Sequence, residues 1–117
     1  MITVGSIREG LRGLARHPLF HHIGVLDLTR HLIQARLWVR ADLFAQVYRN
    51  DGSDVTNLLV VLEQQSIFAR DEIRSLWHKH PFEHPAEHDI SVDGRRKVEF
   101  LEFFEEVQEL LIKEDLL

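Results

Sequence analysis

The 117-residue chain contains no cysteine, which excludes disulfide bonds, thiolate metal sites and cysteine nucleophiles. No apolar run approaches the roughly 18 residues that a membrane-spanning helix needs. The segment Met1–Ser6 lacks the basic and apolar regions of a secretory signal. Glycine is scarce and scattered, so the chain has no glycine-rich phosphate loop. We therefore expect a cytoplasmic protein with no membrane partner.

Negative charge is scarce in the first part of the chain and abundant in the second. Residues 1–50 hold seven arginines against three acidic residues, whereas residues 51–117 hold seven lysines and arginines against sixteen acidic residues. The net charge of −5 argues against nucleic acid as a partner, because that binding needs a net basic face. The uneven distribution indicates complementary faces that pair within the protein or between subunits.

The composition is that of a globular domain. Hydrophobic residues make up 44% of the chain and charged residues 28%, and the length is close to the commonest domain size. We predict a single domain that spans residues 1–117.

Apolar residues recur at helical spacing along most of the chain. Ser6–Glu9 matches a capping box, Ile7, Leu11 and Leu14 follow on one helix face, and Pro18 ends the segment. A final helix is expected from Ser91 or Asp93 onward. These patterns predict an all-α fold, a compact bundle of about six helices. Its expected core residues are Leu32, Phe44, Val47, Leu59, Leu62, Ile73, Leu76, Trp77, Leu101, Phe104 and Leu111.

Residues 27–77 read as two tandem helix–turn–helix units. The clearest turn signal of the chain, Asn50–Ser53, separates them. Asp27 and Asp54 occupy matching positions at an offset of 27 residues, and Asp42 and Asp71 match at an offset of 29. Neither unit alone would bury its apolar face, so the two are expected to pack together.

The segment 78–88 differs from the rest because it concentrates histidine and proline. It holds four of the eight histidines and two of the three prolines, and Pro81 and Pro85 disfavour a continuous helix. We predict a solvated loop, with no metal and no cofactor. Imidazole and carboxylate groups are nevertheless suitable ligands for transition metals. The candidate ligands for a metal site are His80, His84, His88, Glu83 and Glu87.

Two other local patterns leave alternatives open. Arg74 and His80 are similar to the Arg-x(4–6)-His motif of HEPN-type helical ribonucleases, in which the two residues act on the scissile phosphate. The stretch Ile90–Gly94 permits a short hairpin, since Asp-Gly suits a two-residue turn, and such a hairpin would indicate a winged helix.

The stretch Leu58–Ile73 resembles the junction between the fourth and fifth helices of death-effector-type domains. Lys113–Leu117 is similar to the Arg-x-Asp-Leu-Leu signature of that family, with Lys113 in place of the arginine. The resemblance implies a helical module that binds other helical modules through charged faces and has no catalytic activity of its own.

No complete catalytic set is recognisable, so the sequence gives little support for an enzyme. We predict an interaction or regulatory module that binds a protein partner or associates with itself. The expected contact residues are a stripe of arginines on the first helix and apolar residues on the last. They are Arg8, Arg12, Arg16, Phe100, Phe103 and Leu110. The alternative function is a histidine-dependent metal-binding protein or a HEPN-like ribonuclease centred on residues 74–88.

Overall fold

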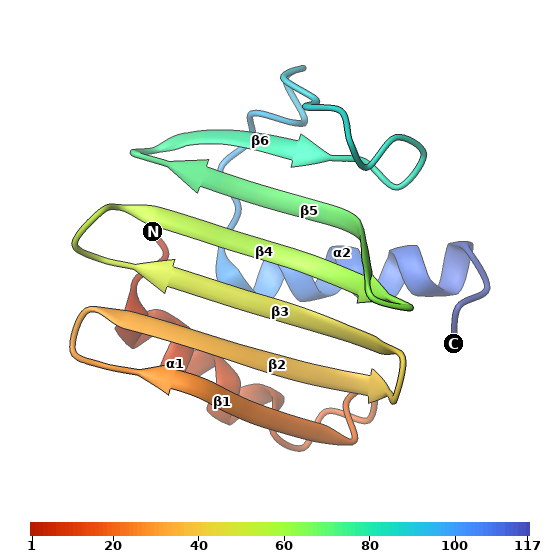
Figure 1. Ribbon diagram of the computed structural model, residues 1–117, viewed down its shortest axis with the longest axis horizontal. Helices are drawn as coiled ribbons and strands as arrows, with labels where there is room; N and C mark the ends of the chain where they lie inside the picture. Colours follow the sequence, from red (N-terminus) through yellow and green to blue (C-terminus); the bar gives the residue numbers. More distant parts are fainter.

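The computed structural model describes residues 1–117 as a six-stranded antiparallel sheet with two helices (Figure 1). The strands lie in the sheet in the same order as in the chain, which makes the sheet a meander. Neither helix is long and apolar enough to cross a membrane. In chain order the elements are α1 (Val4–Leu14), β1 (His22–Leu28), β2 (Leu32–Arg40), β3 (Leu43–Asn50), β4 (Val55–Leu62), β5 (Gln65–Ile73), β6 (Leu76–His80) and α2 (Phe100–Lys113).

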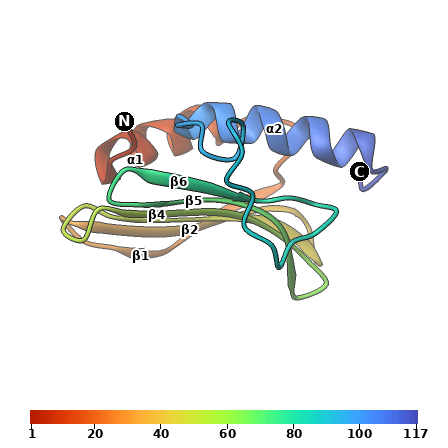
Figure 2. The ribbon, with the colours of Figure 1, turned by 90° about the horizontal axis from the view of Figure 1, so that it is seen from above.

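Both helices cover the same face of the sheet, and the core lies between them and the strands (Figure 2). The helices approach closely at Gly10, where a Cβ atom would lie 2.4 Å from the Phe100 ring. The buried side chains of α2 recur at helical spacing and are Phe100, Phe103, Phe104, Val107 and Leu111. No helix covers the opposite face of the sheet, which we call the open face.

The predicted all-α bundle is wrong, because the central segments alternate between two faces with the period of a strand. In β2, Ile33, Ala35 and Leu37 are buried beneath the helices, whereas Gln34 and Arg36 lie on the open face and are half-buried. The open face also carries the apolar residues Trp38, Phe44, Leu59 and Val61. Apolar residues therefore occur on both faces of the sheet. When residues from the two faces are read together along the sequence, their spacing resembles that of an amphipathic helix.

The predicted helix–turn–helix repeat is also wrong. Asp42 lies in the turn between β2 and β3, whereas its supposed counterpart Asp71 lies inside β5. The turn expected at Asn50–Ser53 is present and joins β3 to β4. The Oδ1 atom of Asn50 accepts hydrogen bonds from the backbone amides of Gly52 and Ser53, at 2.9 and 3.0 Å.

The resemblance to death-effector-type domains does not hold. Leu58–Ile73 forms parts of β4 and β5, joined by the two-residue turn Glu63–Gln64. Both turn residues have positive φ, 50° and 70°, as a tight hairpin turn requires. The stretch Ile90–Gly94 forms neither a hairpin nor the start of a helix, since α2 begins only at Phe100.

The predicted core is right at four positions and wrong at three. Val47, Trp77, Phe104 and Leu111 are buried. Ile73, Leu76 and Leu101 are exposed, and the remaining predicted core residues are half-buried. The half-buried set lies on strands and consists of Leu32, Phe44, Leu59 and Leu62.

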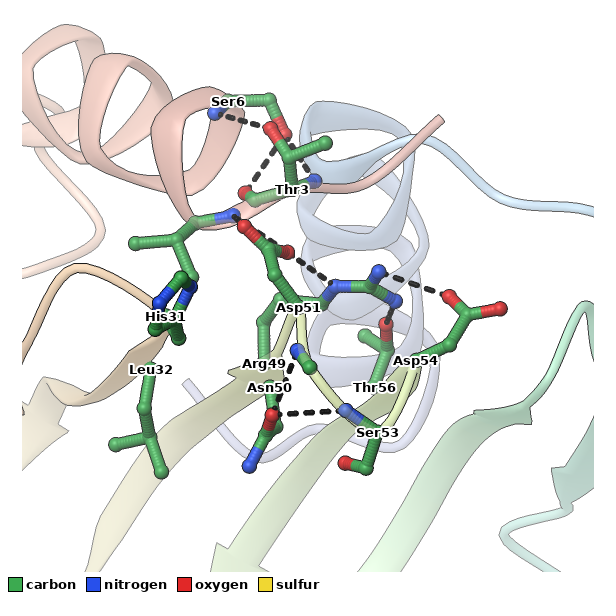
Figure 3. Close-up of polar contacts among 12 residues, drawn as sticks. Thr3, Ser6, His31, Leu32, Arg49, Asn50, Asp51, Ser53, Asp54 and Thr56 are labelled. Atoms are coloured by element: carbon green, nitrogen blue, oxygen red, sulfur yellow. Dashed lines mark hydrogen bonds and ion pairs between the residues drawn. The ribbon is translucent and has the colours of Figure 1, made fainter.

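Arg49 fastens the start of α1 to the sheet (Figure 3). Its buried guanidinium donates to Asp51, Asp54 and Thr56 at 2.8 to 3.0 Å, and it lies 3.2 Å from Glu72. The Asp51 carboxylate in turn accepts from the backbone amide of Val4, the first residue of α1. A carboxylate at this end of a helix also interacts favourably with the helix dipole.

A second buried arginine, Arg70, fastens α2 and the preceding loop to the sheet. Its Nε and Nη2 atoms donate to the two carboxylate oxygens of Glu106, at 2.6 and 2.7 Å, and Nη1 donates to the carbonyl of Asp93 at 2.8 Å. The Asp93 carboxylate lies 2.5 Å from the Nζ atom of Lys79. Chiefly this hydrogen bond from Lys79, together with the charge of Arg70, lowers the pKa of Asp93 from 3.8 to about 2.

The lowered pKa makes the contribution of Asp93 to stability depend on pH. A carboxyl group whose pKa is lower in the folded protein stabilises the fold above its unfolded pKa, and this contribution is lost as the pH falls through the folded value. Because the side chain is half exposed, we expect Asp93→Asn to lower the free energy of unfolding at pH 7 by only about 1 kcal/mol. The difference should shrink as the pH falls below about 3.8, be small at pH 2 and vanish only below that pH.

Urea unfolding of the wild type and Asp93→Asn across this pH range measures the effect. Asp27→Asn, at an exposed position of β1, is the matched control and should change the free energy of unfolding by less than about 0.5 kcal/mol. A loss in Asp93→Asn that is as large at pH 2 as at pH 7 would contradict the ion-pair account.

Candidate metal centre

His78 and His80 on β6 project from the open face. They are two residues apart in a strand, so both side chains point to the same side. The strand register places Asp71 of β5 directly opposite His78. The side chains of all three residues are 17% to 20% exposed, which leaves the cluster accessible from the open face.

The loop after β6 returns a third histidine to this place. The backbone of Lys79 forms two hydrogen bonds with that of Asp89, at 2.7 and 3.2 Å. His88, the neighbour of Asp89, therefore lies beside His78 and His80. One ligand atom from each of the three histidines lies within 4.8 Å of the others. The ring centroids of the three imidazoles are 4.6 to 5.1 Å apart.

Asp71 is held against two of these imidazoles. Its Oδ2 atom lies 3.3 Å from Nε2 of His80 and 3.5 Å from Nε2 of His78. The other oxygen, Oδ1, accepts a hydrogen bond of 3.1 Å from the side-chain amide of Asn57 on β4. Asn57 therefore fixes the carboxylate in the orientation in which it faces the histidines.

The loop also selects the tautomer of His80. Its Nδ1 atom lies 2.9 Å from the carbonyl oxygen of Pro85, and since a carbonyl only accepts, Nδ1 carries a proton. The neutral imidazole then presents an Nε2 lone pair toward Asp71. A lone pair that faces a carboxylate oxygen at 3.3 Å is favourable only with a positive charge nearby, either a proton or a metal ion. Hydrogen bonds of this kind from the remote imidazole nitrogen orient histidine ligands in metal sites.

His78 is the member of the cluster whose protonation is disfavoured. Burial lowers the pKa of its imidazole, and the neighbouring His80 and His88 act in the same direction, while Asp71 opposes them. An unprotonated imidazole retains the lone pair that a metal ligand needs.

A polar cleft of about 440 Å³ extends from the cluster over the open face. One row of directly paired residues crosses the sheet from β2 to β6 and is entirely polar: Gln34, Tyr48, Asn57, Asp71 and His78. The adjacent row is Arg36, Gln46, Leu59, Ala69 and His80. Leu59 and Ala69, the apolar and the small side chain in the middle of this second row, form the floor of the cleft.

Of the five predicted metal-ligand candidates, the structure brings together two, His80 and His88. His84, Glu83 and Glu87 are exposed elsewhere on the loop and do not belong to the cluster. The sequence prediction of ligands missed His78 and Asp71. A His-x-His pair points to one side when it lies in a strand, so the assignment of β6 as a strand would have revealed His78.

The predicted partner-binding residues are divided by the fold. Arg8, Arg12 and Arg16 are exposed on α1, but Phe100 and Phe103 are buried in the core. Leu110 is half-buried. A role in partner binding stays a prediction, and for the two buried phenylalanines it would require them to leave the core.

The ribonuclease-like pair Arg74 and His80 lies on a different scaffold from the helical one that the motif implies. Arg74 is in the turn between β5 and β6 with a φ of 51°, at the opposite end of β6 from His80. A five-residue strand separates the two Cα atoms by roughly 16–20 Å. The two side chains therefore do not form one compact site.

No family model, no curated protein sequence and no solved structure matches the chain.

Proposed function

We propose that the protein binds a divalent transition-metal ion, Zn²⁺ being the best fit, through His78, His80, His88 and Asp71. The observation that carries the proposal is the convergence of three imidazoles from a strand and a returning loop, with ligand atoms within 4.8 Å of one another. Imidazole nitrogen suits zinc, copper, nickel and iron, whereas Mg²⁺ and Ca²⁺ prefer oxygen ligands.

The separations in the cluster support a tetrahedral site. With bonds of about 2.0–2.1 Å to zinc, two tetrahedral ligand atoms lie roughly 3.3–3.4 Å apart. The distances from Asp71 Oδ2 to the Nε2 atoms of His80 and His78, 3.3 and 3.5 Å, match this value. The three imidazole ligand atoms lie within 4.8 Å of one another, so shifts of at most roughly 1.4 Å bring them to the tetrahedral separation, and the exposed side chain of His88 is free to move in this way.

Three protein imidazoles and a carboxylate fill the coordination sphere that zinc adopts in closed sites. The ion would then connect the loop 81–89 to the sheet through His88. Binding of metal to the folded state alone stabilises it, by about 2.7 kcal/mol when the free metal concentration is one hundred times the dissociation constant.

Titration of Zn²⁺ into the metal-free protein should therefore show one equivalent bound per chain. We expect His80→Ala and His88→Ala each to weaken binding at least about 100-fold, since even residues that only orient a ligand contribute 10- to 100-fold. Isothermal titration calorimetry measures both the stoichiometry and the affinity. The same titration with thermal unfolding should show an increase in the melting temperature of the wild type.

His84→Ala is the matched control, because it removes an exposed histidine of the same loop that lies outside the cluster. It should bind Zn²⁺ as the wild type does. Equal losses in His84→Ala and His88→Ala would identify a loose surface site and contradict the proposal, as would the absence of binding to the folded wild type.

The interaction function expected from the sequence stays a prediction, and so does the cytoplasmic location. Metal binding is compatible with both. Sedimentation of the metal-free and the Zn²⁺-loaded protein measures self-association directly.

A further inference from the structure

Arg36 is a fixed cation with no acidic partner. Its Nε atom donates a 2.9 Å hydrogen bond to Oε1 of Gln46, on the neighbouring strand β3. None of the ion pairs of the protein includes Arg36, and no protein acceptor is hydrogen-bonded to its Nη atoms. This differs from Arg49 and Arg70, whose guanidinium groups are surrounded by carboxylates. A half-buried, oriented guanidinium with free N–H groups is a receptor for an anion.

An aromatic platform holds the guanidinium in place. The Cζ atom of Arg36 lies 4.7 Å from the ring centroid of Phe44 and 5.9 Å from that of Trp38. The two rings are themselves in contact, with centroids 4.5 Å apart. These residues line a cleft of about 660 Å³ on the open face, which also has Leu59 and Val61 in its lining. The size is typical of sites for small molecules.

The charges around this cleft favour one anionic group rather than a polyanion. Asp42 lines the cleft but is paired with Arg40 at 2.7 Å. Glu63 lines it as an exposed residue of the β4–β5 turn, and it forms no ion pair. These carboxylates and the net charge of −5 oppose a nucleic-acid strand, whose binding scales with the number of phosphates neutralised.

We propose that this cleft binds a small organic anion that carries a planar ring. The ring stacks on Trp38, and a carboxylate or phosphate group accepts hydrogen bonds from the Nη atoms of Arg36. Aromatic side chains supply the apolar contact, and the guanidinium supplies the charge recognition. The occupant is thus defined by two chemical features, an apolar planar ring and an anionic group.

This site is separate from the proposed metal site. Arg36 and His80 are the two ends of one row across the sheet, four strand spacings apart. At about 4.8 Å per spacing their Cα atoms are roughly 19 Å apart. The two clefts share Gln46 and Leu59, so a longer ligand that extends toward the metal site would contact the same floor.

Phenylacetate, phenyl phosphate and the neutral phenylacetamide are matched probes for this site. Titration of each into metal-free protein, followed by NMR, should shift the indole N–H resonance of Trp38. The resonance of Trp77, which is buried beneath the helices, should not move. The two anions should bind at least about tenfold more tightly than the amide. The tighter of the two identifies the acid group, and either order supports the proposal.

Arg36→Gln should weaken binding of the anions about tenfold or more and leave the weak binding of the amide unchanged. Arg12→Gln is the matched control, since it removes the same charge from an exposed position of α1, on the other side of the sheet. His88→Ala should bind the anions as the wild type does, so a failure of the metal site does not affect this test. Equal affinities for the anion and the amide, or for the wild type and Arg36→Gln, would overturn the proposal.

Discussion

Replacing Arg70 with methionine should lower the free energy of unfolding by about 3–5 kcal/mol. The Arg70 side chain is 1% exposed and forms a bidentate ion pair with Glu106 of α2. It also donates a hydrogen bond to the backbone carbonyl of Asp93. Methionine fills much of the space but leaves the Glu106 carboxylate, which is only 25% exposed, with just the longer contact to the exposed Arg96, at 3.4 Å. The desolvation cost of this carboxylate is then no longer offset by a close, buried ion pair. Urea unfolding followed by circular dichroism measures the loss.

Two controls separate this charge effect from a packing effect. Arg30→Met, at an exposed position of the β1–β2 turn, should change the free energy of unfolding by less than about 0.5 kcal/mol. The double variant Arg70→Met with Glu106→Leu should recover part of the loss, since no buried charge is left unpaired. A double variant less stable than Arg70→Met would show that Glu106 is not destabilised by the missing arginine.

Phe103→Ala should lower the free energy of unfolding by about 3–5 kcal/mol, the usual cost of removing a buried aromatic ring. Its side chain is 0% exposed, stacks on Phe68 of β5 at a centroid distance of 6.2 Å and meets Phe104 edge to face at 5.4 Å. The ring thereby joins α2 to the sheet, and a cavity at this position would lie in the middle of the core.

Leu101→Ala is the matched comparison, because Leu101 is on the same helix but 51% exposed. It should cost less than about 0.5 kcal/mol beyond the small change in helix propensity. The helical interpretation of the sequence predicts the reverse, with Leu101 in the core and Phe103 free for a partner. A large loss for Leu101→Ala with a small loss for Phe103→Ala would therefore contradict the observed orientation of α2.

The helices at the two ends of the chain could be predicted, but not their exact phase. The amphipathic spacing of Ile7, Leu11 and Leu14 correctly indicates α1, although Thr3 rather than Ser6 is the residue that caps it. In α2 the apolar face is so wide that two neighbouring helical phases fit the sequence. Only the position of the sheet selects Phe100 and Phe103 for the core.

The sequence does not predict the sheet, because the usual signals of strands and hairpins are absent or obscured. The tight turns after β4 and β5 consist of Glu63–Gln64 and Arg74–Ser75, which have positive φ but contain neither glycine nor asparagine. The sequences of these two turns therefore do not predict hairpins. Aromatic residues on the open face, such as Trp38 and Phe44, also hide the alternation of apolar and polar residues that identifies a strand with one solvated side.

The candidate site could be predicted only in part, for the same reason. The concentration of histidine in residues 78–88 was visible, and two of its members belong to the cluster. The contribution of Asp71 depends on the pairing of β5 with β6, and that of His88 depends on the return of the loop at Asp89. Such long-range pairings are not encoded in the spacing of residues within one segment.

The metal site is tested most directly by crystals grown with Zn²⁺, with diffraction recorded on both sides of the zinc absorption edge. We expect one anomalous peak per chain on the open face, about 2.0–2.1 Å from nitrogen atoms of His78, His80 and His88 and from an oxygen of Asp71. A map without a peak there, with zinc bound instead by His84, Glu83 or Glu87 or not at all, would contradict it.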